Sequence, residues 1–167
     1  MKTMHTIVVF LCATFWAGSD LAAQIDHRAA FEQLKALEGR WEGSRTAAGG
    51  VTRLNYRVAS NGSVVMEILN EAGADEMINM YHLVGGELRA THYCAGGNQP
   101  HLRLTRATGG GLHFALSGGE GFDPARDGHI HEVGITFRDD GRLDSRWVWY
   151  EGGRPDHDNT FTVRRVR

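Results

Sequence analysis

The sequence predicts an all-β protein: an antiparallel up-and-down barrel of about ten strands with one short N-terminal helix. From Arg40 onward, short runs of residues alternate between apolar and polar, which is typical of half-buried strands. Glycine-rich turns separate these runs at near-regular spacing, and Gly and Asn/Asp-Gly supply the positive φ angles of tight hairpins. A meander of about ten strands closes most economically into a barrel, because closure removes its edges. The turns are Gly49-Gly50, Asn61-Gly62, Gly85-Gly86, Gly96-Gly97-Asn98, Gly109-Gly110-Gly111, Gly118-Gly119, Asp140-Gly141 and Gly152-Gly153.

The first residues are typical of a secretory signal peptide. Lys2 gives a positive start, residues 7–16 are apolar, and small residues follow up to Ala22-Ala23. The apolar stretch is too short to span a bilayer as a permanent helix. We therefore expect a signal peptide over residues 1–23, a single domain over residues 24–167, and a periplasmic or secreted protein. The alternative for this segment is a buried N-terminal helix.

The charge and cysteine content of the sequence limit the classes of partner and the covalent links that we expect. The formal net charge is −2, and no basic stripe or run of like charges occurs, so we expect no nucleic-acid partner. Cys12 lies in the predicted signal without the small preceding residues of a lipoprotein cleavage site, so we expect no membrane anchor. Cys94 is the only cysteine after residue 23, which excludes a disulfide within the domain. The sequence does not predict an oligomeric state.

The helix is predicted over residues 26–37, where Phe31, Leu34 and Leu37 follow helical spacing, Asp26 suits the N-cap and Gly39 follows the end. We expect it to cover one mouth of the barrel. The strands are predicted at 40–47, 51–60, 63–72, 75–84, 87–94, 101–108, 112–117, 129–138, 142–151 and 160–166. One connection, 118–128, is long enough to be a portal or lid segment, although plain surface loops are commoner.

Two tight turns predict which residues share the inner face. Around Asn61-Gly62, a two-residue turn places residues opposite one another in pairs: Val58 with Val65, Tyr56 with Glu67, and Leu54 with Leu69. Around Gly85-Gly86 the pairs are Leu83 with Leu88, Tyr81 with Ala90, and Asn79 with His92. Opposed residues point the same way, and these sets are the more apolar ones, so both should face inward.

The sequence predicts the inward-facing residues of the later strands less completely. Alternation places His131 on one face with Val133, Ile135 and Phe137, with His129 just before the strand. The turn at Asp140-Gly141 leaves two alternatives for residues 142–151. Either the indoles of Trp147 and Trp149 face inward, or Val148 and Tyr150 do.

The segment Leu37-Glu38-Gly39-Arg40-Trp41-Glu42-Gly43 resembles the calycin signature shared by lipocalins, fatty-acid-binding proteins and nitrobindins. Its spacing looks closest to lipocalin-like, uncharacterised exported bacterial domains. Segments at Met80-Tyr81-His82-Leu83, Thr91-His92-Tyr93-Cys94, Gly97-Asn98-Gln99-Pro100, Trp147-Val148-Trp149-Tyr150-Glu151 and Pro155-Asp156-His157 are similar to motifs of that group. The resemblance implies that the Trp closes one barrel end, and that the interior is a small-ligand cavity.

Nitrobindins bind haem through a histidine on a late strand, but 161–166 here contains none and the nearest is His157. We therefore expect no cofactor, with haem or a metal ion as the remaining possibilities. His92, His129 and His131 are the histidines that a metal site would use, yet no Cys/His cluster has ligand spacing.

The main candidate site is the set of polar residues predicted inside the barrel. Burying an unpaired polar group costs about 1–3 kcal/mol, so such residues should be paired, hydrated or in use. The predicted ligand-binding residues are Tyr56, Glu67, Asn79, Tyr81, His92, Cys94, His131, Trp147 and Trp149.

Each candidate has a simpler interpretation. The Glu67–Tyr56 pair can be an internal hydrogen bond, Cys94 a small apolar residue, and the histidines structural or surface groups. The two tryptophans suit core packing as well as stacking on a flat ligand.

Three functions follow from this set. The first is an exported protein that binds a small apolar or amphipathic molecule in a polar-spotted cavity. The second is a cofactor-free isomerase, cyclase or hydratase, with Glu67 as base and His92 or Tyr81 as acid. The third is an interaction module with a filled barrel, which the polar outer residues Arg53, Asn55 and Arg57 disfavour.

Overall fold

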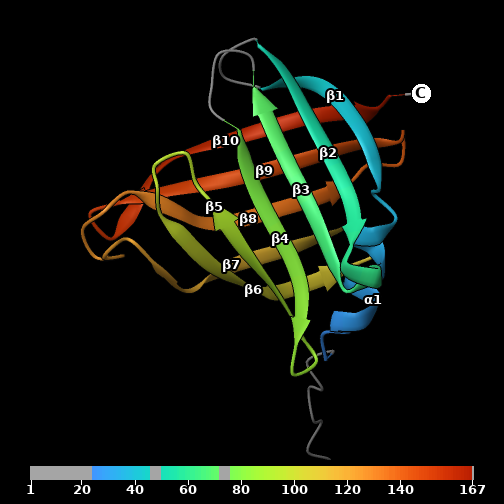
Figure 1. Cartoon of the computed structure of the whole chain (residues 1–167). Helices are drawn as coiled ribbons and strands as arrows, with labels where there is room; N and C mark the ends of the chain where they lie inside the picture. The colour runs from blue at the N-terminus through green and yellow to red at the C-terminus, as the bar shows by residue number, and fades with distance from the viewer. Residues whose placement is uncertain (1–23, 46–49, 72–75, 167) are drawn as a thin grey trace, which may run out of the picture.

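The computed structural model describes residues 24–45, 50–71 and 76–166. Within these residues the chain forms one closed antiparallel barrel of ten strands with a single short α-helix, as the sequence predicted (Figure 1). Neighbours in sequence are neighbours in the wall, and β1 pairs with β10 to close it. The elements are α1 (His27–Lys35), β1 (Gly39–Arg45), β2 (Val51–Ala59), the 3₁₀ turn η1 (Ser60–Gly62), β3 (Val64–Glu71), β4 (Met77–Val84), β5 (Glu87–Tyr93), β6 (Gln99–Thr108), β7 (Gly111–Glu120), β8 (His129–Phe137), β9 (Arg142–Glu151) and β10 (Arg154–Arg165).

The predicted register of the two early hairpins is confirmed. All six predicted pairs occur, three between β2 and β3 and three between β4 and β5. Asn61 and Gly62 have φ angles of 53° and 81°, which is the left-handed pair that a tight hairpin turn needs. The inner face of β2–β5 therefore carries the residues that alternation placed there.

Helix α1 covers one end of the barrel, where it contacts β2, β4, β5 and β6 (Figure 1). The Asp26 carboxylate caps its first turn by accepting from Ala29 N at 2.9 Å. Its face of Ala30, Phe31 and Leu34 is buried in the barrel core. Its position agrees with the expected cover of one mouth.

Trp41 is buried where α1 meets the barrel. Its Nε1 donates to Leu37 O at 2.8 Å, and the Arg165 guanidinium lies 4.6 Å from the indole centroid. Arg165 also donates to Ala36 O at 2.8 Å, so the last strand holds the C-terminal end of α1. Gly39, with φ of 125°, begins β1 in a backbone conformation that other residues rarely adopt.

Two late strands are longer than predicted. β7 continues through Gly118 and Gly119 to Glu120, which shortens the predicted long connection at its N-terminal end. β10 begins at Arg154, so Pro155 and His157 lie in a strand and not in a loop. A register shift between these two residues accommodates the proline, which has no N–H for a regular ladder.

The predicted signal peptide, residues 1–23, lies outside the described residues. Among the residues that the structure describes, no helix is long and apolar enough to cross a membrane.

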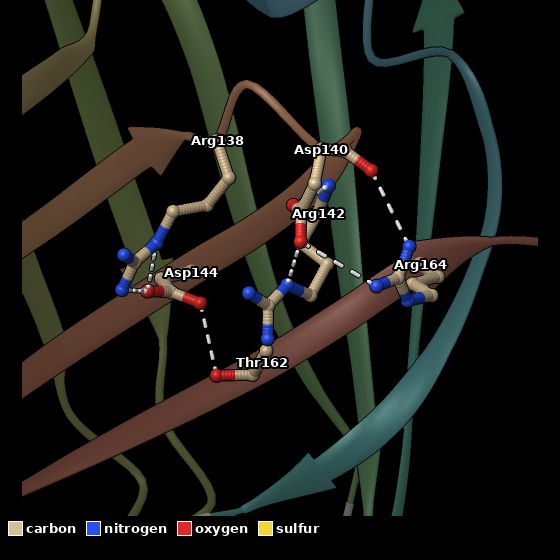
Figure 2. A network of polar contacts seen from close by, with 6 residues as sticks. All are labelled: Arg138, Asp140, Arg142, Asp144, Thr162 and Arg164. Atoms are coloured by element: carbon tan, nitrogen blue, oxygen red, sulfur yellow. Dashed lines mark hydrogen bonds and ion pairs between the residues drawn. The ribbon is translucent and has the colours of Figure 1, made fainter.

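Ion pairs join the β8–β9 turn to the outer faces of β9 and β10 (Figure 2). Asp144 Oδ2 accepts from Arg138 Nε at 2.7 Å, and Asp144 Oδ1 accepts from Thr162 Oγ1 at 2.9 Å. Asp140 pairs with Arg142 at 2.7 Å and with Arg164 at 3.5 Å. These contacts hold the β8–β9 turn against β10 and engage both carboxylates.

Candidate functional site

A belt of polar side chains crosses the inner face of four neighbouring strands. Tyr56 on β2 lies opposite Glu67 on β3, which lies opposite Asn79 on β4, which in turn lies opposite His92 on β5. Tyr81, two residues after Asn79 on β4, shares their face. All five are at most 1% exposed, and we call them the Glu67 cluster.

Glu67 is the centre of this cluster. Its Oε1 accepts from the Tyr56 hydroxyl at 2.7 Å, and its Oε2 accepts from Asn79 Nδ2 at 2.7 Å and from the Tyr81 hydroxyl at 2.6 Å. Three donors from three positions therefore surround one carboxyl group. The predicted Glu67–Tyr56 hydrogen bond is present, but it is one part of a larger network.

The network fixes the tautomer of His92. Because the Asn79 amide donates its N–H to Glu67, its Oδ1 is left as the acceptor that faces His92 Nδ1 at 2.9 Å. Nδ1 must then carry the proton, and the lone pair of neutral His92 lies on Nε2. Nε2 is buried and has no hydrogen-bond partner among the described residues. The cluster thus ends in one uncommitted acceptor inside the barrel.

Aromatic rings from the opposite half of the wall pack against the cluster. Trp147 on β9 meets His92 edge-on at a centroid distance of 4.8 Å, and its Nε1 donates to Ser145 Oγ at 2.7 Å. Phe114 on β7 packs against Tyr81 at 5.4 Å. Trp147 faces the interior, which settles the alternative left open for residues 142–151.

Burial shifts the protonation of the cluster. Desolvation raises the pKa of Glu67, while the hydrogen bonds from Tyr81, Tyr56 and Asn79 lower it and leave a net rise. Burial and the Glu67 charge raise the pKa values of Tyr56 and Tyr81 well above 10.0. Burial lowers the pKa of His92 to about 3, so this imidazole is neutral at physiological pH.

Burial bears on whether the cluster could transfer protons. Glu67 is buried and accepts three hydrogen bonds from protein side chains, whereas an efficient base needs access to its substrate. A histidine with a pKa near 3 holds a proton weakly at neutral pH, far from the value that suits an acid or base there. A neutral imidazole with a fixed tautomer is instead a good acceptor or ligand.

His131 does not share the face of Val133. A register shift between Ile130 and Glu132 reverses the alternation, because the extra residue takes up one position of the strand. The His131 ring lies 3.8 Å from the Tyr150 ring, and its Nδ1 lies 3.0 Å from His129 Nε2. The three rings form a group on the face of β8 and β9 that lies away from the Glu67 cluster.

Cys94 and Trp149 lie near the end of the barrel opposite α1, and both are half-buried. Cys94 follows β5, and its Sγ accepts from Gly96 N at 3.4 Å within the next turn. The Trp149 ring covers Gly128 and stacks with His157 at 6.1 Å. Within the described residues, neither Cys94 nor Trp149 has a hydrogen bond to the Glu67 cluster, and their roles in ligand binding stay predictions.

Pockets open on the outside of the barrel. One of about 450 Å³ lies over β6–β9, and three of about 290 to 460 Å³ surround the start of α1. The Glu67 cluster lines none of these four. Within the described ranges, no group of three or more His, Cys, Asp or Glu side chains is arranged to hold a metal ion.

Comparison with protein-family models gives no match, and comparison with curated proteins gives none either. The fold and the site place the protein in the class of closed ten-stranded antiparallel barrels with a buried polar cluster. This fold is compatible with the calycin type.

Proposed function

We propose that this protein binds a small, largely apolar molecule inside its barrel, and that the molecule donates one hydrogen bond to His92 Nε2. The supporting observation is the unpartnered Nε2, which the Asn79 and Glu67 contacts hold as a bare acceptor. A buried polar atom without a partner costs free energy, so a ligand that supplies a donor gains what the empty protein lacks. The Glu67 cluster orients His92, and His92 makes the contact.

The surroundings of His92 favour an apolar body for this ligand. Trp147 packs on the ring, and Leu54 and Leu69 are buried on the same inner face of β2 and β3. Further polar groups on the ligand would find no free donor in the cluster, because Tyr56, Asn79 and Tyr81 already donate to Glu67. The ligand class is thus a compact apolar molecule with a single hydroxyl or N–H group.

The end opposite α1 is the route of access that the fold favours. α1 covers the other end, whereas His92 is the next-to-last residue of β5 on the far side. Nε2 is covered by protein, so a side chain must move for a ligand to reach it. Trp147 is the candidate, because its indole packs directly on the His92 ring.

We also infer that the protein is an exported member of the calycin type. The Gly39-Arg40-Trp41 segment, with Trp41 buried beside α1, supports the relation. The composition of residues 1–23 supports export to the periplasm or medium. N-terminal sequencing of the protein recovered outside the cytoplasm tests this, and a chain that retains its first residues there contradicts it.

A matched pair of probes tests the binding proposal. 4-Propylphenol carries a hydroxyl donor on an apolar body, and 4-propylanisole has a methyl ether in its place. Tryptophan fluorescence reports binding, because Trp147 lies beside His92. We expect the phenol to bind about tenfold more tightly, the value of one good hydrogen bond.

The control is the His92→Phe variant, which keeps a ring of similar shape but has no acceptor. The preference for the phenol should vanish in it, while His101→Gln on the outer surface should leave it unchanged. Equal affinity for the two probes in the unaltered protein, or a preference that survives His92→Phe, contradicts the proposal.

A further inference from the structure

Four residues form a continuous row across the outside of the barrel wall. Arg106 on β6 lies opposite His113 on β7, His113 opposite Gly134 on β8, and Gly134 opposite Arg146 on β9. Opposed residues point the same way, so these side chains leave the wall on one side. Gly134 interrupts the row, and two arginines end it.

A pocket of about 450 Å³ lies over this row. Gly134 and Gly111 form part of its lining, where the wall carries no side chain, and Arg106, His113, Arg146 and Thr136 stand around them. A Cβ at Gly134 would meet only ordinary contacts, at 4.0 Å from Arg146 and His113. Space for a side chain therefore exists at this position and is left empty.

The charges at this pocket are unequally compensated. The Arg106 guanidinium has no hydrogen bond or ion pair to any residue in the described part of the chain. Arg146 directs its Nε to Asp158 at 2.7 Å. The Arg106 guanidinium thus stands at the pocket with its donors unused.

Carboxylates close to the row are engaged by other groups. Glu132 Oε2 lies 3.3 Å from His113 Nε2, and Asp144, which is opposite Thr136, is held by Arg138 and Thr162 (Figure 2). Arg138 compensates the charge of Asp144, and Glu132 is directed toward His113 and the Tyr150 hydroxyl, so neither carboxylate pairs with Arg106. An anion in the pocket would meet the uncompensated charge of Arg106.

We propose that this pocket binds the phosphate of a small phosphate monoester. Guanidinium groups match a phosphate with paired N–H donors, and Arg106 on β6 and Arg146 on β9 both line this pocket. The Thr136 hydroxyl adds a donor on a third side. The glycines give the phosphate close access to the wall, and the pocket volume leaves room for the organic part of the ester. This site lies on the outer wall and does not depend on the interior site proposed above.

Calorimetric titration of the purified protein with phenyl phosphate tests the proposal. Benzyl alcohol, of similar size without the charge, should not bind, and binding of phenyl phosphate should weaken as salt rises. Arg106→Gln should weaken it about tenfold or more, because charge-assisted hydrogen bonds are lost. Arg57→Gln, on the outer face of β2, is the matched control and should leave it unchanged.

A second variant keeps every charge and fills the space. Gly134→Val suits a strand and places two methyl groups in the pocket, so it should abolish binding without unfolding the barrel, as circular dichroism would show. Absence of phenyl phosphate binding, equal loss in Arg57→Gln, or full binding in Gly134→Val would overturn the proposal.

Two further probes identify the source of the phosphate. Inorganic phosphate that binds as tightly as phenyl phosphate shows that the organic part is not recognised, which contradicts a monoester site. Cosedimentation with phosphatidylcholine vesicles that contain phosphatidic acid, lost in Arg106→Gln, would place the monoester on a lipid headgroup. No cosedimentation, with phenyl phosphate still bound, would assign the site to a soluble ester.

Discussion

The two halves of the barrel place their polar residues on opposite sides of the wall. In β2–β5 the inner face carries the Glu67 cluster, which is sealed from water. In β6–β9 the inner face is mainly apolar, with Leu104, Phe114 and Val133, while the outer face of β9 carries Asp144 and Arg146, which pair with Arg138 and Asp158. One strand pattern thus supports two kinds of polar network, and they differ chiefly in their exposure to solvent.

This difference determines how much each contact contributes to stability. In the interior, a polar group that loses its partner cannot turn to water, so the cost of leaving it unpaired is paid in full. On the outer wall, water replaces a lost partner and salt screens the charges. Matched substitutions in the two networks should therefore differ strongly in effect, although the hydrogen bonds look alike.

Glu67→Leu should give the largest loss of stability. The substitution leaves the Tyr56 hydroxyl, the Tyr81 hydroxyl and Asn79 Nδ2 buried without an acceptor. At about 1–3 kcal/mol for each unpaired group, we expect a loss of about 3 kcal/mol or more in the free energy of unfolding. Urea denaturation measures it.

Glu67→Gln is the control for shape, since a glutamine still accepts at one oxygen and should cost clearly less. A second check removes the unpaired donors as well. Adding Tyr56→Phe and Tyr81→Phe to Glu67→Leu removes two buried hydroxyls that have no acceptor, so it should recover part of the lost stability. A Glu67→Leu protein as stable as the unaltered one would show that the cluster is hydrated in solution.

His92 should make stability depend on pH with a sign opposite to that of Glu67. The folded pKa near 3 lies below the ordinary 6.5, so the unfolded chain binds the proton first as pH falls. The unfolding free energy should therefore fall between about pH 6.5 and pH 3, with a slope of up to about 1.4 kcal/mol per pH unit. The raised pKa of Glu67 acts oppositely, favouring the fold at low pH and losing that effect as pH rises.

The difference in unfolding free energy between the unaltered protein and His92→Gln isolates the contribution of His92, because the Glu67 carboxyl is present in both proteins. Urea titrations from pH 3.5 to pH 7.5 should give curves that converge toward acid pH, where the variant escapes the penalty. Parallel curves over this range would contradict a neutral, buried His92.

Local sequence signals predicted most of the fold and the common face of the five residues in the Glu67 cluster. The Asn61-Gly62 and Gly85-Gly86 turns fix the register of β2–β5 over short distances, so Tyr56, Glu67, Asn79, Tyr81 and His92 were found together. The order of the strands along the sequence could not predict which side chains on the opposite side of the barrel contact β5. Trp147 meets His92 through closure of the barrel, which depends on all ten strands.

The remaining errors have identifiable causes. Strict alternation placed His131 inward, but the shift at Ile130–Glu132 is one residue long and leaves no clear composition signal. The last strand was predicted only at 160–166, which left Pro155 outside it, whereas a proline at a register shift is compatible with a strand. The Arg106–Gly134–Arg146 row was missed because its register spans four strands, one irregular pairing between β6 and β7, and the long connection before β8.

Asp144→Ala should lower the free energy of unfolding by an intermediate amount, because the exposure of Asp144 lies between that of the Glu67 cluster and that of the outer ion pairs. Asp144 lies on the outer face, yet its side chain is only 12% exposed because Arg138 and Thr162 cover it (Figure 2). Losing its hydrogen bonds should cost about 1–2 kcal/mol in the free energy of unfolding. Urea denaturation at low and high salt measures it, and a loss as large as that of Glu67→Leu would contradict the role given to burial.

Asp140→Asn should have the smallest effect and gives the sharpest comparison with Glu67. Like Glu67, the Asp140 carboxylate has three contacts: Arg142 N at 3.1 Å, Arg142 Nε at 2.7 Å and Arg164 Nη2 at 3.5 Å (Figure 2). Its backbone bond to Arg142 and the nearby guanidinium groups lower its pKa, so any contribution to stability is present at neutral pH and is lost as pH falls through that lowered pKa. The side chain is 43% exposed, however, and water can replace each contact. We expect no resolvable change in the urea midpoint at pH 7 and physiological salt. A loss comparable to that of Glu67→Leu would show that the number of contacts, and not their burial, sets the stability of this barrel.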